Sequence, residues 1–526
     1  MRCLRQLLLC VLCVLLPLLT FAGCDGQAIA EAPTIALMPL DSRPCNTQYP
    51  ELLAEVSTAE LLLPPEDAMD HFLEPANRDA LWQWLEGAAE DADALIIFTN
   101  SLFCGSLIAS RSSGAYDNID DDLARLKALC ANTDAPITVV QVLPRLTPNQ
   151  FDNVLYPYVD ALTPYGRAWD EADAAGETPP DSVDGVPEEA LLSYRALHEK
   201  SAALAESLNT MAADGLIDRL LIAQDDGDAY CPANITFRTL EAERADNTEL
   251  LHGADELGML LVSACAADGL AATPARLVYS TESSKDRCYP YESVTLAEMT
   301  AQKLALGGLE TNEDADTTLW LHTDTADAAE TAAAASDHDG RFALADVALT
   351  NEADPALADT LLSPEAVDGL CAYAGWNTAG NSIGTVCAML RAMDALDARW
   401  DNLSSDAQEH AVNALYRFRA IRLAEDVCYM AELRSDLQTA FSDEDLSDYT
   451  TTFTDDAAWQ TANTRLAEAF APYSDTLAGL FDGPHTLSLA HHDIPLIISD
   501  FSASATYPWS RSFEVKVTPE LTVTLE

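Results

Sequence analysis

Two adjacent carboxylates, Asp225 and Asp226, form the most suggestive chemical feature of the sequence. They stand in the segment LIAQDDGDAY, directly after an apolar run. Successive residues at a strand end point in different directions, so one carboxyl group can enter a cleft while the other braces a neighbour. Close acids in a shielded cleft have pKa values that move apart, which suits division into acid and base. A metal site and a loop-capping pair are the alternatives.

A second charged pair, Asp41 and Arg43, lies in the segment PLDSRPCNTQYP after the first apolar run of the mature chain. A guanidinium group is a fork-shaped donor that binds carboxylates and other oxygen ligands well. We therefore predict that Arg43 binds substrate and that Asp41 is its partner. A salt bridge that only fixes the loop is the alternative.

A third pair of acids, Asp255 and Glu256, occurs in HGADELGMLL, where an apolar-periodic helix is expected to begin. We predict Glu256 as a further catalytic carboxylate and Asp255 as a substrate-binding residue. Capping alone is the alternative, because acids are favoured by the helix dipole and by the free N–H groups of a helix start.

The segment YAGWNTAGNSIGT, residues 373–385, joins an apolar strand to a helix through a glycine-rich turn. Asn377 lies just before the helix, and Asn381 and Thr385 follow on one helical face. Beside Trp376, this face suits a sugar-like ligand, because an aromatic ring stacks while amides bind hydroxyl groups. A packed helix with tight glycine contacts is the alternative. The segment matches neither a dinucleotide fingerprint nor a P-loop, so nucleotide binding lacks support.

Nine apolar runs are expected to be the strands that position these residues. They lie at 35–40, 60–63, 94–99, 137–143, 219–224, 276–280, 317–322, 342–348 and 370–374. Strands this apolar are buried on both faces, which is typical of parallel sheets. Because they alternate with helical stretches, we predict an α/β fold with a mostly parallel sheet. The strand count favours a TIM-barrel-like arrangement slightly over two Rossmann-like lobes.

Polar residues follow nearly all of these strands and complete the predicted site. In parallel α/β folds, ligands bind at the carboxyl ends of the strands, in barrels and in open sheets alike. We therefore predict one cleft that also contains Asn100, Arg145 and Asn351 as substrate-binding residues.

The domain organisation follows from where the alternation of strands and helices stops. We expect an α/β core at 35–387 with a helical insertion near 150–215, where the chain is acidic and has proline-rich loops. Residues 388–500 are expected to be mainly helical, and 501–526 to form a C-terminal strand pair.

Residues 1–23 have the pattern of a secretory signal peptide. Arg2 and Arg5 precede an apolar run that is short for a bilayer span. The run ends in the letters FAGC, which resemble a lipobox and make Cys24 the predicted lipid acceptor. With a tether at 24–34, the protein would be lipid-anchored at the extracellular face of the cell membrane. An ordinary cleaved signal is the alternative.

The composition excludes one broad class of function. The chain has 86 acidic and 28 basic residues and a net charge of −58. Such a field repels nucleic acids and anionic lipids, so no nucleic-acid partner is expected and membrane contact is expected only through the lipid anchor. The sequence contains no EF-hand loop, Cys-x-x-Cys motif or Cys-His cluster. No cofactor is predicted, although a divalent cation between carboxylates stays open.

Several of these segments resemble DUF4127, a bacterial domain-of-unknown-function family. Across about residues 35–435 they occur in the family's order: PLDSRP, a Ser-Leu-x-x-Gly-x-Leu-x-x-Ser-Arg stretch, QDD, GADE, YPYES, Asn351 in DVALTNEADP, and YAGWNTAGNSIGT. The chain departs from the pattern at Glu352, where a glycine is expected after Asn351. The resemblance implies a shared fold and site and brings no established reaction.

The leading hypothesis is a cell-surface hydrolase of a glycan or another polyhydroxylated substrate. Asp225 or Asp226 would be the general acid/base, with Glu256 or Asp41 as the second carboxylate. The alternatives are a non-catalytic solute-binding lipoprotein and a metal-dependent hydrolase. The oligomeric state stays open.

Overall fold

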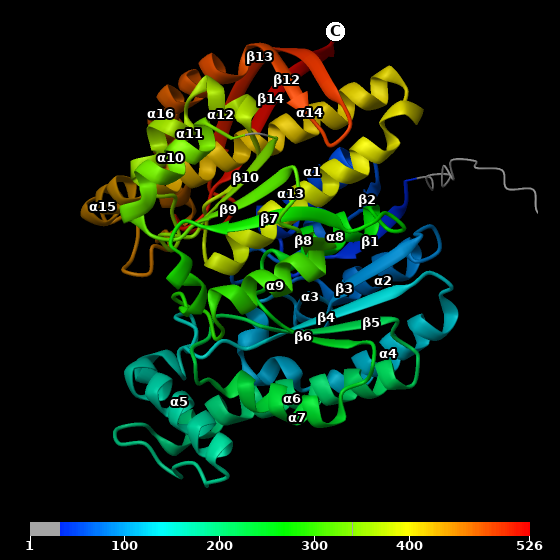
Figure 1. Ribbon diagram of the computed structural model, residues 1–526. Coiled ribbons are helices and arrows are strands. Elements are labelled where there is room, and N and C mark those ends of the chain that lie inside the picture. Colours follow the sequence, from blue (N-terminus) through cyan, green and yellow to red (C-terminus); the bar gives the residue numbers. More distant parts are fainter. Residues whose placement is uncertain (1–31, 339) are drawn as a thin grey trace, which may run out of the picture. The chain divides into compact units, whose positions relative to one another are not determined.

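The computed structural model describes residues 32–338 and 340–526, and Figure 1 shows how their helices and strands are arranged. The predicted signal peptide and Cys24 lie outside the described residues. The expected α/β class is confirmed, because parallel strands alternate with helices along most of the chain. Within the described ranges, no helix has both the length and the apolar character needed to cross a membrane.

The first sheet has six parallel strands in the order β2-β1-β3-β4-β5-β6. Its strands are apolar throughout because both faces are buried: Ile35 and Leu37 face one core, whereas Ala36 and Met38 face another. The strands are β1 (Thr34–Met38), β2 (Glu60–Leu62), β3 (Ala94–Phe98), β4 (Ile137–Leu143), β5 (Arg219–Gln224) and β6 (Thr248–His252). We call this sheet and its helices lobe 1.

The second sheet has five parallel strands in the order β11-β10-β9-β7-β8. The strands are β7 (Thr273–Tyr279), β8 (Leu309–Thr311), β9 (Thr317–His322), β10 (Arg341–Asp346) and β11 (Leu370–Ala374). Counted within each sheet, both follow the doubly wound order 2-1-3-4-5, and lobe 1 adds a sixth strand. We call the second sheet and its helices lobe 2. The described strands thus form two open sheets and no closed barrel, so the two-lobed alternative describes them better than the barrel does.

Helices from both lobes pack together between the two sheets. Helices α1 (Gln48–Val56) and α8 (Leu257–Ala266) lie against lobe 1, and α9 (Leu296–Gly307) and α13 (Ala379–Arg399) lie against lobe 2. Helix α8 contacts α1, α9 and α13, which makes this layer a shared core. Further helices that connect strands are α2 (Arg78–Ala88), α3 (Thr99–Cys104), α4 (Ile119–Asn132), α7 (Pro232–Glu243), α10 (Ala328–Ser336), α11 (Ala358–Leu361) and α12 (Pro364–Gly369).

The region expected as a helical insertion contains two helices with different roles. Helix α6 (Glu188–Ala213) packs on β4 and β5, so it is part of the crossover between these strands. Helix α5 (Val159–Ala175) contacts α7, and its Tyr165 packs with Tyr194 in a small separate core. Only the α5 part is therefore added to the regular α/β pattern.

The C-terminal region combines long helices with a small antiparallel sheet. Helix α14 (Ser405–Arg422) continues into a π-helix (Leu423–Leu433) and α15 (Arg434–Asp443), and α16 (Asp456–Phe481) follows. The sheet consists of β12 (Gly483–Ser488), β13 (Asp493–Thr506) and β14 (Lys516–Leu525), and it packs on α14 and α16. The expected terminal β element is thus present, but it has three strands and begins at Gly483, within the region 388–500 expected to be mainly helical.

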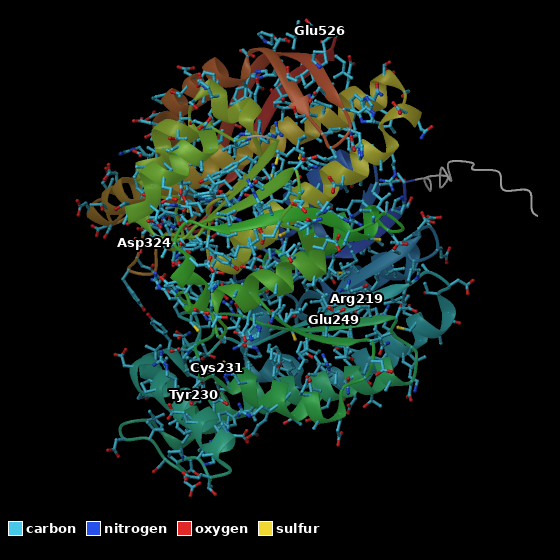
Figure 2. All side chains as sticks on the ribbon, viewed as in Figure 1. Arg219, Tyr230, Cys231, Glu249, Asp324 and Glu526 are labelled. Atoms are coloured by element: carbon cyan, nitrogen blue, oxygen red, sulfur yellow. The ribbon has the colours of Figure 1, made fainter. Side chains whose placement is uncertain are left out.

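Charged side chains on the sheet edges pair at the surface. Figure 2 labels Arg219 and Glu249, which lie on the neighbouring strands β5 and β6. Their side chains are joined by an ion pair of 2.7 Å, and they keep 34% and 42% of their exposure. Pairs of this kind contribute little to stability, which makes this one a useful reference for the buried pairs described below.

Candidate active site

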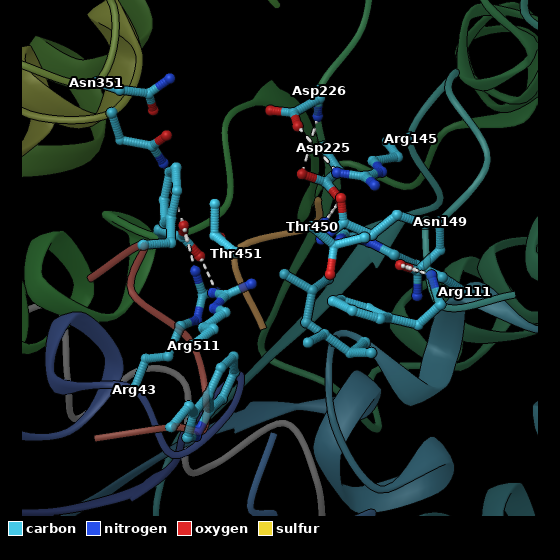
Figure 3. A pocket seen from close by; sticks show the side chains of 18 of the residues that line it. Arg43, Arg111, Arg145, Asn149, Asp225, Asp226, Asn351, Thr450, Thr451 and Arg511 are labelled. Atoms are coloured by element: carbon cyan, nitrogen blue, oxygen red, sulfur yellow. Dashed lines mark hydrogen bonds and ion pairs between the residues drawn. The ribbon is translucent and has the colours of Figure 1, made fainter. Parts of the chain in front are cut away.

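A cavity of about 420 Å³ lies at the carboxyl ends of both sheets (Figure 3). Residues that follow β1, β4, β5 and β6 line it from lobe 1, and residues that follow β10 and β11 line it from lobe 2. Loops at 449–451 and 509–513 form a third wall. Seven of the predicted site residues line this cavity: Arg43, Arg145, Asp225, Asp226, Asp255, Asn351 and Asn377.

Asp225 is a buried carboxylate that is held by an arginine. Its Oδ2 pairs with Arg111, at the end of a short 3₁₀ helix (Ala109–Arg111), and its Oδ1 accepts the Asp226 N–H at 2.9 Å. Burial alone would raise the pKa of Asp225, but the positive charges of Arg111 and Arg145 outweigh it and lower the pKa below its usual value. Asp225 is therefore ionised at neutral pH.

Asp226 has the opposite properties although it is the next residue. Its pKa is raised to about 7 by burial and by the negative charge of Asp225, against the pull of Arg145 at 3.6 Å. Its side chain keeps one third of its exposure and lines the cavity. A carboxyl group with a pKa close to neutrality can both give and take a proton, which is what general acid–base catalysis requires.

Arg43 and Asp255 form a two-pronged pair at the centre of the site. The Arg43 Nη1 donates to Asp255 Oδ2 at 3.0 Å, and Nη2 donates to Asp255 Oδ1 at 2.6 Å. Behind this pair, the fully buried Asp41 accepts from Arg43 Nε at 3.0 Å and from the Asn46 amide at 2.8 Å. Asp41 thus orients Arg43 from outside the cavity, and Arg43 presents Asp255.

Two asparagines supply the lobe 2 side of the cavity. Asn351 and Asn377 have φ angles of 67° and 52°, and the Asn351 N–H donates to the Asn377 carbonyl at 2.7 Å. Asparagine tolerates this left-handed backbone better than most residues. The Asn377 Nδ2 also reaches Asp255 Oδ2 at 3.3 Å and so links the lobes. The turn needs no glycine after Asn351, because Asn351 itself takes the positive φ and Glu352 pairs with Arg434.

The structure corrects the role predicted for Glu256. This side chain is completely buried, pairs with Lys303 and accepts from Asn381 Nδ2 at 2.6 Å, and it does not line the cavity. A Cβ atom on Gly253 or Gly384 would collide with Glu256, so these glycines make room for the buried pair. Asp255 points to the cavity and Glu256 to the lobe interface, because successive residues at a helix start diverge.

Three other predicted residues support the site from behind. The Trp376 indole N–H donates to Thr385 Oγ1 at 3.0 Å inside the core. The ring is therefore buried and is not available to stack on a ligand in the main cavity. The Asn100 amide bonds both the N–H and the carbonyl of Val142 at 2.9 Å and fixes the start of α3, directly after β3, to β4. Asn381 lines a small adjoining cavity of about 30 Å³ and braces Glu256.

Several cavity residues come from segments that the sequence reasoning did not connect with the site. Arg511 and Trp509 lie in the loop before β14, and Thr451 lies in the loop between α15 and α16. Thr451 has a φ of 64°, which is unusual for a β-branched residue, and its carbonyl accepts the Ser512 N–H at 3.0 Å. The only sequence signal was an aromatic-rich loop with an arginine, YPWSRSF, between two strand patterns.

The carboxylates of the cavity are engaged by arginines. Among residues 32–338 and 340–526, no group of three or more His, Cys, Asp or Glu side chains has the geometry to hold a metal ion. Of the three carboxyl groups that line the cavity, Asp226 is the least firmly paired, because Arg145 Nη1 lies 3.6 Å from its Oδ2.

The fold and the cavity define a two-lobed α/β protein with a charged site at the strand ends of both lobes. The family model described as protein of unknown function (DUF4127) matches residues 35–518. The chain therefore belongs to the DUF4127 family, and the match extends through the C-terminal loops that carry Thr451 and Arg511. No match was found among curated proteins or among solved structures.

Proposed function

We propose that the protein is a hydrolase of a glycan or a similar polyhydroxylated substrate, with Asp226 as its proton-transfer residue. The observation that carries this proposal is the contrast between neighbouring carboxylates: Asp225 is kept ionised by Arg111, whereas the pKa of Asp226 is raised to about 7. Pairs of titratable groups whose pKa values are pushed apart are characteristic of acid–base sites.

The remaining cavity residues suggest how such a substrate would bind. Asn351 and Asn377 offer amides to hydroxyl groups, and Asp255, held in place by Arg43, offers a charged hydrogen-bond acceptor. In the proposed step, the proton of Asp226 goes to the leaving oxygen while a water molecule oriented by Asp255 attacks the carbon and loses its proton to that carboxylate. Asp255 takes the place that the sequence analysis gave to Glu256 or Asp41.

Replacing Asp226→Asn tests the proposal directly. We expect turnover of a cleavable glycan, found with a panel of labelled oligosaccharides, to fall by about 10²–10⁴-fold, since the amide cannot transfer a proton. Asp228→Asn is the matched control, because Asp228 lies in the same loop, pairs with Arg167 at 2.7 Å and does not line the cavity. Equal turnover in Asp226→Asn and the wild type would refute the role of Asp226.

A non-catalytic solute-binding protein is the second candidate function. The observation that favours it is the contribution of polar groups by both lobes to one cavity, which suits capture of a small solute. The two functions are separated by incubating bound oligosaccharides with the protein: recovery of intact ligand at every pH between 5 and 8 would favour binding alone.

We also propose that the protein is anchored outside the cell by a lipid on Cys24. The support is the sequence pattern before this residue, which lies outside the described ranges. Wild-type protein should partition into a detergent phase and incorporate labelled palmitate in cells, whereas Cys24→Ala should do neither. Equal labelling of both proteins would refute the anchor.

A further inference from the structure

Arginine is concentrated in the cavity to a degree that the composition does not lead one to expect. The chain has 28 lysines and arginines against 86 acids, yet four arginines line this one cavity: Arg43, Arg111, Arg145 and Arg511. In a chain with a net charge of −58, an anion is repelled unless positive charge is collected locally. Three carboxylates, Asp225, Asp226 and Asp255, line the same cavity, so what matters for an anion is which arginine charges they leave incompletely paired.

The four arginines differ in how completely their charge is paired. All three guanidinium nitrogens of Arg43 donate to Asp41 and Asp255, which leaves this residue no free charge. Arg145 has the weakest pairing, because its Nε donates to the Thr147 carbonyl at 3.1 Å and its Nη1 lies 3.6 Å from Asp226. When Asp226 is protonated, Arg145 loses its ion-pair partner among the described residues, although the ionised Asp225 still attracts it.

Arg145 also experiences repulsion from two other arginines that line the cavity. Its pKa is lowered to about 10 by burial first, then by Arg111, and further by Arg511. Mutual repulsion between arginines costs free energy, and a bound anion would remove that cost. We call Arg111, Arg145 and Arg511 the arginine cluster; its members line the same cavity and come from three different parts of the chain (Figure 3).

Aromatic packing holds Arg511 in place on the third wall. Its guanidinium carbon lies 4.9 Å from the centre of the Trp509 ring, 5.4 Å from Phe72 and 5.4 Å from Phe513. Its Nε and Nη2 also bond Glu514. A guanidinium group fixed in this way loses little freedom when it binds an oxyanion, which favours a site that exists before the ligand arrives.

We propose that the arginine cluster is a subsite for an anionic group, a carboxylate or a phosphate-type oxyanion, carried by the substrate next to Asp226. This inference rests on the proposed function only in that it takes the bound molecule to be a substrate. Binding of an anion can be measured without turnover. An anion on Arg145 would neutralise the charge that favours the ionised form of Asp226. The bound substrate would thereby keep the acid protonated for the transfer to the leaving oxygen.

The test measures binding of four probes by isothermal calorimetry: glucuronate, glucose 6-phosphate, inorganic phosphate and glucose. We expect at least one of the anionic sugars to bind at least about tenfold more tightly than glucose, since a charged hydrogen-bonded pair adds roughly this factor. Comparison of glucuronate with glucose 6-phosphate identifies the anion. Inorganic phosphate shows whether the charge alone is sufficient.

Variants assign the binding to the cluster. Arg145→Gln and Arg511→Gln should each weaken binding of the anionic sugar by about tenfold or more, with Arg145→Lys in between. Arg465→Gln is the control, because Arg465 is an exposed arginine that pairs with Glu444 at 2.8 Å away from the cavity. Thermal unfolding of each variant shows that it is folded; if Arg145→Gln is not, Arg511→Gln decides.

The outcomes separate this inference from the proposed function. Anionic sugars that bind no better than glucose, or that bind both glutamine variants as tightly as the wild type, would overturn the subsite. Asp226→Asn should keep its affinity for the anion. If anions bind through the cluster and no glycan is ever cleaved, the hydrolase proposal fails and the subsite stands.

Discussion

The two lobes have the same strand order but very different residues at their carboxyl ends. In lobe 1, the strand ends carry charged side chains, among them Arg43, Asp225 and Asp226. In lobe 2, the corresponding position between β7 and β9 is filled by the lobe's own hydrogen bonds: Ser280 Oγ donates to Asp327 at 2.9 Å and accepts the Thr323 N–H at 3.0 Å.

This difference shows that the fold determines where a binding site can form, whereas the loops after the strands determine which side chains line it. Doubly wound sheets offer a crevice at the switch in strand order, and in lobe 2 hydrogen bonds between the lobe's own side chains occupy this position. Lobe 2 instead contributes neutral amides, Asn351 and Asn377, from strands further along its sheet. The charge is thus on one side of the cavity and the neutral donors are on the other.

The largest effect is expected where the lobes are held together. Lys303→Met leaves Glu256 as an unpaired, fully buried charge and should lower the free energy of unfolding by about 3–5 kcal/mol. Urea denaturation measures this loss, and adding Glu256→Met should recover most of it. Arg219→Met, which breaks the exposed pair with Glu249, is the control and should cost less than about 1 kcal/mol. Equal losses in the two single variants would contradict the importance of the buried pair.

The pH dependence of activity tests the charged side of the comparison. If protonated Asp226 is the acid, kcat/KM should fall as the pH rises through about 7. Asp225→Asn removes a negative charge that raises the pKa of Asp226, so this fall should move to lower pH. Arg111→Gln removes a positive charge that lowers the same pKa, so the direct effect of the lost charge is a move to higher pH. If the pH profiles of kcat/KM were unchanged in both variants, the ionisation of Asp226 would not control the rate.

The pH dependence of stability should also be unusual. Burial raises the pKa of Asp70 to about 8, of Asp226 and Asp426 to about 7 and of Asp346 to about 6, all above the ordinary value of 3.8. These four groups therefore hold more protons in the folded protein than in the unfolded chain between about pH 4 and 8, and their contribution to stability falls as the pH rises. The lowered pKa values of His198, about 3, and His252, about 4, act in the opposite direction below about pH 6.5 but involve only two groups. The urea midpoint should be higher at pH 5 than at pH 8; the reverse order would show that these groups are ionised in the folded protein.

A smaller effect is expected on the neutral side of the cavity. Asn351→Gly keeps the backbone with its positive φ but removes the amide, so KM should rise by up to about tenfold while kcat changes little. Asp500→Gly is the matched control, because Asp500 also has a positive φ, of 58°, and does not line the cavity. A fall in kcat alone would instead place Asn351 among the residues that act in the transition state.

The smallest effect is expected from removing divalent cations. Because the carboxylates Asp225 and Asp255 pair with arginines, treatment with a chelator should leave turnover unchanged. Loss of turnover that is restored by a divalent cation would support the metal-dependent alternative.

The sequence by itself determined the strands and much of the charged side of the site. All nine expected strands are present, because an apolar run buried on both faces is a strong local pattern. Three strands were missed: β6, which is half polar, β8, which has three residues, and β12, which lies in the region expected to be mainly helical. Polar residues directly after buried strands identified Arg43, Asp225 and Asn377, since the end of a strand is encoded next to the strand itself.

Only the tertiary structure decided how these parts combine. Strand order depends on packing between distant segments, and so the sequence did not separate two open sheets from a barrel. Asp255 and Glu256 are neighbours of similar chemistry, and only their surroundings assign one to the cavity and the other to Lys303. Arg511 and Asp226 are separated by more than half the length of the chain. No local sequence pattern predicts that the fold brings their segments to one cavity.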